Sequence, residues 1–208
     1  MGKKKVVTER RLLTEEQLLA ILAAVPDRGR LGGLDLRFLI WILVNLGLRI
    51  SEALGLKWSD INWEIGELHV QRRWYRGDLS EDGTTKTENS CRKMQMGPLV
   101  NLFRQHYPGP HARDQHVFIG DDGVMPPDER DLLRYVLRPA LKRLKLYYPG
   151  FGWHAFRRQN ITWRQQKGGA TPFEAPKAAG HGSLDTTYDY SLVIRNGRRR
   201  TCRRYSTS

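Results

Sequence analysis

The sequence predicts a mainly α-helical protein with a small antiparallel β-sheet, which is an α+β fold. Amphipathic or apolar runs with helical spacing lie before and after about 61–96, whereas alternating β-favouring residues are confined to that stretch. There is no internal repeat. The 208 residues, 39% of them hydrophobic, are enough for one sizeable domain, or for one domain with a long tail.

The first two helices are predicted from a capping signal and an apolar run. Thr14, followed three residues later by Gln17, is a capping-box start, and the amphipathic run after it predicts a helix over about 15–25. The apolar run FLIWILVNLGL at 38–48 is shorter than the roughly 20 residues that a membrane span needs. We therefore interpret it as a second, buried helix that ends near Gly47.

A short third helix and the sheet come next. Ser51 is a suitable N-cap for a helix within SEALGLKW at 51–58. The stretches ELHVQRRWY and CRKMQM alternate and favour strands, which predicts antiparallel pairing across roughly 61–96. Between them lies a long turn, 76–90, that is rich in Gly, Asp, Ser and Thr.

Helices are expected again in the second half of the chain. One covers about 99–106, and a longer one covers 128–146 with Asp128 as its cap and a kink at Pro139, because proline interrupts the helical hydrogen bonds. The stretch HAFRRQNITWRQQ, 154–166, predicts another helix.

Two more helices and a tail complete the predicted chain. TPFEAPKAAG at 171–180 begins with Thr171 as N-cap, and Glu174 completes a second capping box. Ser183 can cap a last helix that carries two tyrosines. The segment 193–208 is basic and has too few apolar residues to fold alone, so we expect it to be a flexible tail.

The charge balance indicates a polyanionic partner. Lys and Arg total 35 against 22 Asp and Glu, which leaves a formal charge of +13. An enzyme with a neutral ligand does not need such an excess, whereas a nucleic-acid-binding protein does. The alternative is a protein that is simply basic and soluble.

The cysteines, the N-terminus and the histidines narrow the class further. Cys91 and Cys202 are far apart and form no CxxC pair, so a reducing cytoplasm is expected. MGKKK precedes no apolar stretch, so it does not predict a signal peptide. His106, His111 and His116 are five residues apart and lack the close paired spacing of zinc ligands, so no metal site is expected.

Four separated stretches carry groups suited to phosphoryl transfer. They are LGLRISEALGLKW with Arg49, TKT with Lys86, HAFR with His154 and Arg157, and GHGSLDTTYDY with His181 and two tyrosines. Two arginines can clamp phosphate oxygens bidentately, and histidines exchange protons near neutrality. A lysine can protonate a leaving alkoxide. A tyrosine, with an ordinary pKa of about 10, needs cationic surroundings to act as a nucleophile.

Each of these residues also has a structural interpretation when taken alone. Arg49 and Glu52 could form only a buried ion pair, and Lys86 could be a solvated lysine in a polar turn. His154 could be a hydrogen-bonded residue at a helix start, and both tyrosines could pack in the core.

The four stretches, in this order, resemble the signature boxes of the tyrosine recombinases, the phage-integrase family. The resemblance runs from about residue 10 to 192 and implies the tyrosine recombinase catalytic-domain fold, with a catalytic domain over 1–192. Family members usually carry an N-terminal DNA-binding domain of roughly 100 residues, and this chain starts where that domain would end.

The resemblance assigns the phosphate-binding groups. Arg49 and Arg157 correspond to the two arginines that grip the scissile phosphate, and His181 to a histidine that hydrogen-bonds it. Glu52 is the expected partner that orients Arg49.

The resemblance also assigns the groups that break and form bonds. Tyr190, nine residues after His181, corresponds to the nucleophile that forms a 3′-phosphotyrosine, and Tyr188 would face away. Lys86 is the expected general acid, with Lys93 as the alternative. His154 assists proton transfer at the tyrosine.

The function implied is that of a site-specific DNA recombinase or integrase. Double-stranded DNA is the expected partner, with self-association into a tetramer in the synaptic complex, and no metal, nucleotide cofactor or membrane is implied. Two alternatives remain open: a nicking-closing enzyme similar to type IB topoisomerases, and a non-catalytic DNA-binding module.

Overall fold

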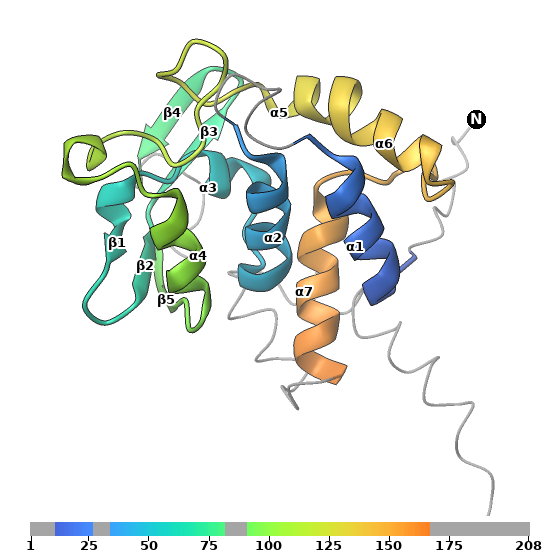
Figure 1. Ribbon diagram of the computed structural model, residues 1–208, viewed down its shortest axis with the longest axis horizontal. Coiled ribbons are helices and arrows are strands. Elements are labelled where there is room, and N and C mark those ends of the chain that lie inside the picture. The colour runs from blue at the N-terminus through green and yellow to red at the C-terminus, as the bar shows by residue number, and fades with distance from the viewer. Residues whose placement is uncertain (1–10, 27–33, 82–90, 167–208) are drawn as a thin grey trace, which may run out of the picture.

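Three helices that are far apart in the sequence lie side by side in the structure, a computed structural model that describes residues 11–26, 34–81 and 91–166 (Figure 1). They are α1 (Glu15–Ala24), α2 (Leu36–Leu46) and α7 (His154–Gln166). α2 packs against both α1 and α7. The strands and α4 (Leu99–His106) lie on one flank of these helices, and α5 (Glu129–Asp131) and α6 (Arg138–Arg143) cross one end.

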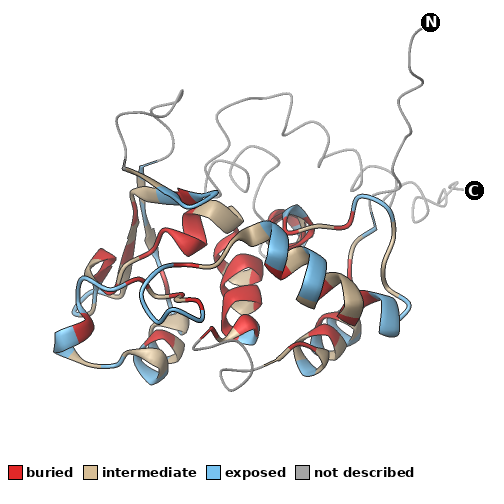
Figure 2. Cartoon of the chain, turned by 90° about the horizontal axis from the view of Figure 1, so that it is seen from above, coloured by how far each residue is buried: buried red, intermediate tan, exposed pale blue. Residues whose placement is uncertain are grey.

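α2 forms the middle of the core because it is apolar nearly all round. Eight of its eleven residues are buried, and a helix that is hydrophobic on every side must be surrounded by protein. Figure 2 shows buried residues concentrated at the centre of the molecule. Asp35 caps the helix by accepting a hydrogen bond from the Phe38 backbone nitrogen at 3.0 Å. The prediction of a buried second helix is confirmed.

The predicted capping box at α1 is also present. The Gln17 backbone nitrogen donates to Thr14 Oγ1 at 3.2 Å, and the Thr14 nitrogen donates to Gln17 Oε1 at 3.0 Å. The helix then ends one residue before the predicted limit. A second contact ties this region down, because the Gln159 amide of α7 bonds both the nitrogen and the carbonyl of Leu13, at 2.8 and 3.0 Å.

The strands form two small antiparallel sheets. β1 (Ile61–Asn62), β2 (Glu67–Val70) and β5 (Arg92–Gln95) pair in the order β1-β2-β5, and β3 (Arg72–Tyr75) pairs with β4 (Asp78–Glu81) as a hairpin. The prediction of antiparallel strands within 61–96 is confirmed, and the fold is α+β as expected. The prediction of one long turn over 76–90 is wrong in its first part, because β4 begins at Asp78 and pairs with β3.

The third helix differs from its prediction. α3 covers Ile50–Leu54 instead of 51–58, and its N-cap is Arg49, so the prediction of Ser51 as the cap is wrong. Glu52 provides the reason, because its carboxylate reaches back to the Arg49 backbone nitrogen. The helix stops at Gly55, where a Cβ atom would lie 2.9 Å from the Arg73 Cα on β3.

The predicted long helix over 128–146 is present but irregular. Asp128 caps α5, and a six-residue π-helical turn (Leu132–Leu137) connects it to α6, which begins just before Pro139. Proline lacks an N–H and breaks the i→i−4 ladder, which a wider turn accommodates. The chain leaves the helix before Lys145, whose φ is 57°.

The remaining predictions differ in their outcome. The helices at 99–106 and 154–166 are present as α4 and α7. The helix at 171–180, the helix capped by Ser183 and the tail 193–208 lie outside the described residues. Among the helices that the structure describes, none has the length and apolar character required to span a bilayer.

Candidate active site

The end of α2 delivers Arg49 from the core to the surface. Gly47 adopts a left-handed conformation, φ 68°, that ends the helix and that glycine tolerates because it lacks a Cβ. Leu48 is buried, and Arg49 follows with 37% of its side chain exposed. The Arg49 guanidinium is therefore anchored at a rigid helix junction and still reaches solvent.

Glu52 holds Arg49 from one helical turn away. Its Oε2 accepts a hydrogen bond from the Arg49 backbone nitrogen at 2.8 Å, and its Oε1 accepts from Arg49 Nη1 at 2.6 Å. Only 6% of the Glu52 side chain is exposed. Burial raises the pKa of Glu52, but a hydrogen bond from Arg92 and the charges of Arg92, Arg157 and Arg49 outweigh burial and hold that pKa below its ordinary value.

α7 brings a second arginine to the same carboxylate. Arg157 Nη1 donates to the Gly47 carbonyl at 2.6 Å and lies 3.7 Å from Glu52 Oε2. One turn further on, Asn160 Nδ2 donates to the Asn45 carbonyl at 2.8 Å. The last carbonyls of a helix have no partner within it, so side chains of α7 cap α2 and fix Arg157 in place.

A third arginine arrives from the sheet. Arg92, the first residue of β5, places Nη2 at 2.9 Å from Glu52 Oε2 and Nη1 at 3.3 Å from Oε1. We call Arg49, Glu52, Arg92 and Arg157 the arginine centre. Three positive charges against one negative charge give it an excess of two positive charges, which suits an anionic phosphate diester.

His154 lies one turn before Arg157, at the start of α7. Although His154 is exposed to solvent as a residue, partial desolvation of its ring and the charges of Arg157, Arg158 and Arg49 hold its pKa below the ordinary value, against an opposing contribution from Glu52. The imidazole is therefore neutral at pH 7, and a neutral imidazole can accept a proton.

The structure brings three of the seven predicted site residues, Arg49, Glu52 and Arg157, into one charged cluster, and it places a fourth, His154, one helical turn before Arg157 on α7. The predicted Lys86, His181 and Tyr190 lie outside the described residues. The Arg49–Glu52 ion pair that we considered as a structural alternative is present as well, but it is part of a larger charged cluster.

Arg92 is the member of this centre that the sequence prediction missed. An arginine in an alternating strand gives no signal of its own, because the pattern does not tell which face meets another element. Only the packing of β5 near α3 shows that Arg92 meets Glu52.

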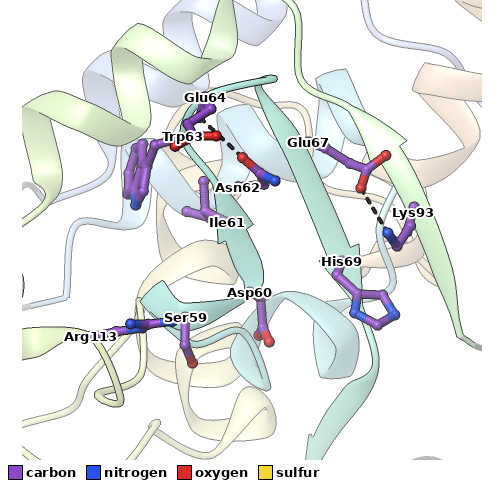
Figure 3. A pocket seen from close by; sticks show the side chains of 10 residues that line it. All are labelled: Ser59, Asp60, Ile61, Asn62, Trp63, Glu64, Glu67, His69, Lys93 and Arg113. Carbon is purple, nitrogen blue, oxygen red and sulfur yellow. Dashed lines mark hydrogen bonds and ion pairs between the residues drawn. The ribbon is translucent and has the colours of Figure 1, made fainter.

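Lys93, the alternative to Lys86, lies on the other side of β5. Successive side chains of a strand point to opposite faces, and Lys93 pairs with Glu67 at 3.2 Å. Figure 3 shows both at a polar cavity of about 540 Å³, together with His69 of β2. The residues that line this cavity include none of the arginine centre, so Lys93 is not placed to act there.

Two of the three evenly spaced histidines have separate environments. His106 stacks on Phe38 and its Nε2 lies 3.1 Å from Asp35 Oδ2, and His116 is buried beside Trp74. Across residues 11–26, 34–81 and 91–166, no three His, Cys, Asp or Glu side chains are grouped as a metal site.

Comparison with known proteins identifies the family. The family model described as Phage integrase family matches residues 11–194. The chain is 25% identical over 189 residues to the putative integrase/recombinase y4rA of Sinorhizobium fredii, covering 88% of this chain and 42% of that protein. It is 30% identical over 114 residues to a tyrosine recombinase XerC-like protein of Caldanaerobacter subterraneus subsp. tengcongensis, covering 50% of this chain and 28% of that protein.

A solved structure agrees with this match at the level of the fold. The structure of the Tn1549 transposon integrase in complex with transposon right end DNA superimposes with a TM-score of 0.70 at 20% identity, covering 97% of this chain and 69% of that one. The chain spans less than half the length of the two sequence relatives. Because the family model covers most of its length, the chain belongs to the phage integrase family.

Proposed function

We propose that this chain is the catalytic domain of a site-specific DNA recombinase that cleaves and rejoins strands through a 3′-phosphotyrosine intermediate. The observation that carries the proposal is the arginine centre, in which two helix-anchored arginines converge on one buried carboxylate beside a neutral histidine. The family match supports it, as do relatives named integrase or recombinase.

The first step in this proposal is capture of the scissile phosphate. Arg49 and Arg157 donate hydrogen bonds to the non-bridging oxygens, where negative charge grows during attack. Glu52 keeps Arg49 oriented, so the guanidinium loses little conformational freedom when the phosphate arrives. The resemblance adds His181 as a further hydrogen-bond donor to this phosphate.

The second step exchanges one ester bond for another. The Tyr190 oxygen forms a bond to phosphorus and its proton passes to His154, while the bond from phosphorus to the 5′-oxygen breaks and Lys86 protonates that oxygen. A 5′-hydroxyl of another strand later reverses the reaction and releases the tyrosine. The bond energy is conserved in the phosphotyrosine, so the proposed reaction needs neither metal nor nucleotide.

The proposed partners follow from the same chemistry. The substrate is double-stranded DNA, in keeping with the formal charge of +13 and with the DNA that the Tn1549 integrase structure holds. Exchange between two duplexes requires several protomers, so we propose a tetramer on DNA, acting in the cytoplasm.

The decisive test is a covalent-adduct assay on a nicked duplex that traps the cleaved strand. Wild-type protein should give an SDS-resistant complex, Tyr190→Phe should abolish it with binding and melting nearly intact, and Tyr188→Phe should retain it. Removing one phenolic oxygen eliminates the nucleophile and leaves the ring. An adduct that survives in Tyr190→Phe and disappears in Tyr188→Phe would move the nucleophile by two residues.

The same assay separates the two alternatives. A protein that binds DNA but never yields an adduct is a non-catalytic binding module. An enzyme that yields an adduct and relaxes supercoils without ever joining two different duplexes is a nicking-closing enzyme.

A further inference from the structure

Arg92 makes a two-pronged contact with the carboxylate that organises the arginine centre. Nη2 lies 2.9 Å from Glu52 Oε2, and Nη1 lies 3.3 Å from Oε1. Only 12% of the Arg92 side chain and 6% of the Glu52 side chain are exposed. A paired fork of this kind fixes the plane of the carboxylate as well as its charge.

The charge count shows why this contact matters for phosphate binding. Without Arg92, the single negative charge of Glu52 would offset one of the two positive charges on Arg49 and Arg157. With Arg92 present, the carboxylate has its own counter-ion, and the equivalent of two positive charges remains for the phosphate. The pairs lie in a poorly solvated place, where such charges are screened weakly.

The geometry shows how Arg92 also acts on orientation. Glu52 Oε1 receives both Arg92 Nη1 and Arg49 Nη1, so the direction in which Glu52 presents that oxygen sets the direction of the Arg49 guanidinium. Arg92 comes from β5 and Arg49 from the start of α3, and Glu52 therefore joins the sheet to the helix junction.

We propose that Arg92 is a positioning residue for strand cleavage. It orients Glu52 and offsets its negative charge, so that the positive charges of Arg49 and Arg157 remain available to the scissile phosphate. This inference rests on the proposed function. Arg92 acts through Glu52 and does not itself need to touch DNA.

The chain offers a matched control in Arg72 and Asp60. Arg72 Nη1 lies 2.6 and 2.7 Å from the two Asp60 oxygens, with 13% and 1% of the two side chains exposed. It is also a poorly exposed arginine–carboxylate pair that involves a strand, but Asp60 does not contact Arg49 or Arg157 through any hydrogen bond among the described residues. Arg72→Gln therefore reports the general cost of breaking such a pair.

The experiment compares two substrates that differ in charge at one atom. Single-turnover adduct formation is measured with the full chain on a nicked duplex carrying either the natural phosphate diester or a methylphosphonate at the scissile position. The methylphosphonate lacks one anionic oxygen, so its cleavage depends less on positive charge in the site. Melting temperature is recorded for every variant.

For Arg92→Gln we expect adduct formation on the diester to fall on the order of 10- to 100-fold, as for loss of a supporting contact behind a reacting group. The fold-loss on the methylphosphonate should be several times smaller. Arg92→Lys keeps the charge and should recover part of the diester rate. Arg72→Gln should lower both rates by the same factor, if it lowers them at all.

The outcomes that overturn the inference are specific. Equal fold-losses of Arg92→Gln on the two substrates, or an Arg92→Lys variant no better than Arg92→Gln, would reduce Arg92 to a structural residue. If Arg92→Gln does not fold, Arg92→Lys alone is compared on the two substrates. Lysine cannot make the two-pronged contact with Glu52, so its loss of rate should again be larger on the diester than on the methylphosphonate. Absence of any adduct in the wild type would instead reject the proposed function, and this inference with it.

Discussion

At the scale of single residues, the two helix-anchored arginines differ in what else they do. Arg157 is buried and donates a hydrogen bond to the Gly47 carbonyl at the end of α2. In contrast, 37% of the Arg49 side chain is exposed, and the backbone of Arg49 caps the start of α3. Arg157 therefore serves both folding and the proposed catalysis, and Arg49 mainly the latter.

Substituting these arginines should separate the two roles. Arg49→Ala and Arg157→Ala should each cut adduct formation by a factor on the order of 10²–10³ or more, as for removal of one donor from an oxyanion site. Arg157→Ala should also lower the free energy of unfolding by about 3 kcal/mol, because a buried carbonyl and Glu52 lose a charged partner. Urea denaturation of both variants measures this, and equal stability losses would contradict the distinction.

His154 leads to a prediction about the pH dependence of adduct formation. Its pKa is below the ordinary value of 6.5, so the neutral, proton-accepting form persists to lower pH than for a free histidine. The rate of adduct formation should fall with acidity only below pH 6.5, and His154→Gln should remove that acid limb along with most of the rate. A limb at or above pH 6.5, or one unchanged in His154→Gln, would show that another group titrates.

Arg158 supplies the matched change for this profile. Its charge is one of the causes that lower the pKa of His154, so Arg158→Gln should move the acid limb to higher pH without removing it. The sign is fixed, because losing a nearby cation makes protonation of the imidazole easier.

At the scale of elements, close backbone packing between α3 and the β3–β4 hairpin positions the junction that carries Arg49 and Glu52. A Cβ on Gly55 would lie 2.9 Å from the Arg73 Cα and 3.0 Å from the Arg72 carbonyl carbon, all backbone atoms that cannot rotate away. Gly55→Ala should therefore lower the free energy of unfolding by about 1–3 kcal/mol.

Gly152→Ala is the control for that measurement. A Cβ there would meet only Leu133 Cδ2 at 3.8 Å, which is an ordinary contact. Its stability in urea should stay within about 0.5 kcal/mol of the wild type. A Gly55→Ala variant as stable as Gly152→Ala would mean that α3 and β3 are not packed as closely as the structure has them.

The elements also show what the sequence could and could not predict. The capping box at Thr14 and the apolar run of α2 are local signals, and both gave correct helices. The cap of α3 was misassigned because serine is the better local cap, whereas Glu52 reaching back to Arg49 depends on a charged cluster built from three segments. The π-helical turn before Pro139 had no local signal that we recognised.

The candidate site shows the same difference between local sequence signals and features that depend on tertiary packing. Arg49, His154 and Arg157 were predicted because short motifs carried them, and the packing of α7 on α2 brings them together. Arg92 was missed because its role depends on the strand face that meets α3. Short sequence motifs thus identified Arg49, His154 and Arg157. Arg92 lies in an ordinary alternating strand, so only the tertiary packing shows that it belongs to the site.

At the scale of the whole molecule, charge should control DNA binding. The formal charge is +13, and six of the arginines lie within residues 195–204, outside the described residues. Phosphate neutralisation releases counter-ions, so binding should be largely independent of sequence and should weaken steeply between 50 and 200 mM salt. Tight, salt-insensitive and site-specific binding by this chain alone would contradict that expectation.

Two truncations should divide the contribution of charge from that of assembly. Deleting 195–208 removes six arginines and no acidic residue, so the formal charge falls from +13 to 13 − 6 = +7. If these arginines meet phosphates, the slope of log K against log salt should become shallower by up to about 5, at about 0.9 per phosphate contact.

Deleting 192–208 also removes the apolar Leu192, Val193 and Ile194, which we expect to dock on a neighbouring protomer. That longer deletion should reduce cooperative assembly on DNA beyond the shorter one, and both proteins should melt cooperatively near the wild-type temperature. Loss of the cooperative melting transition in the longer deletion alone would place these three apolar residues in the core of their own protomer.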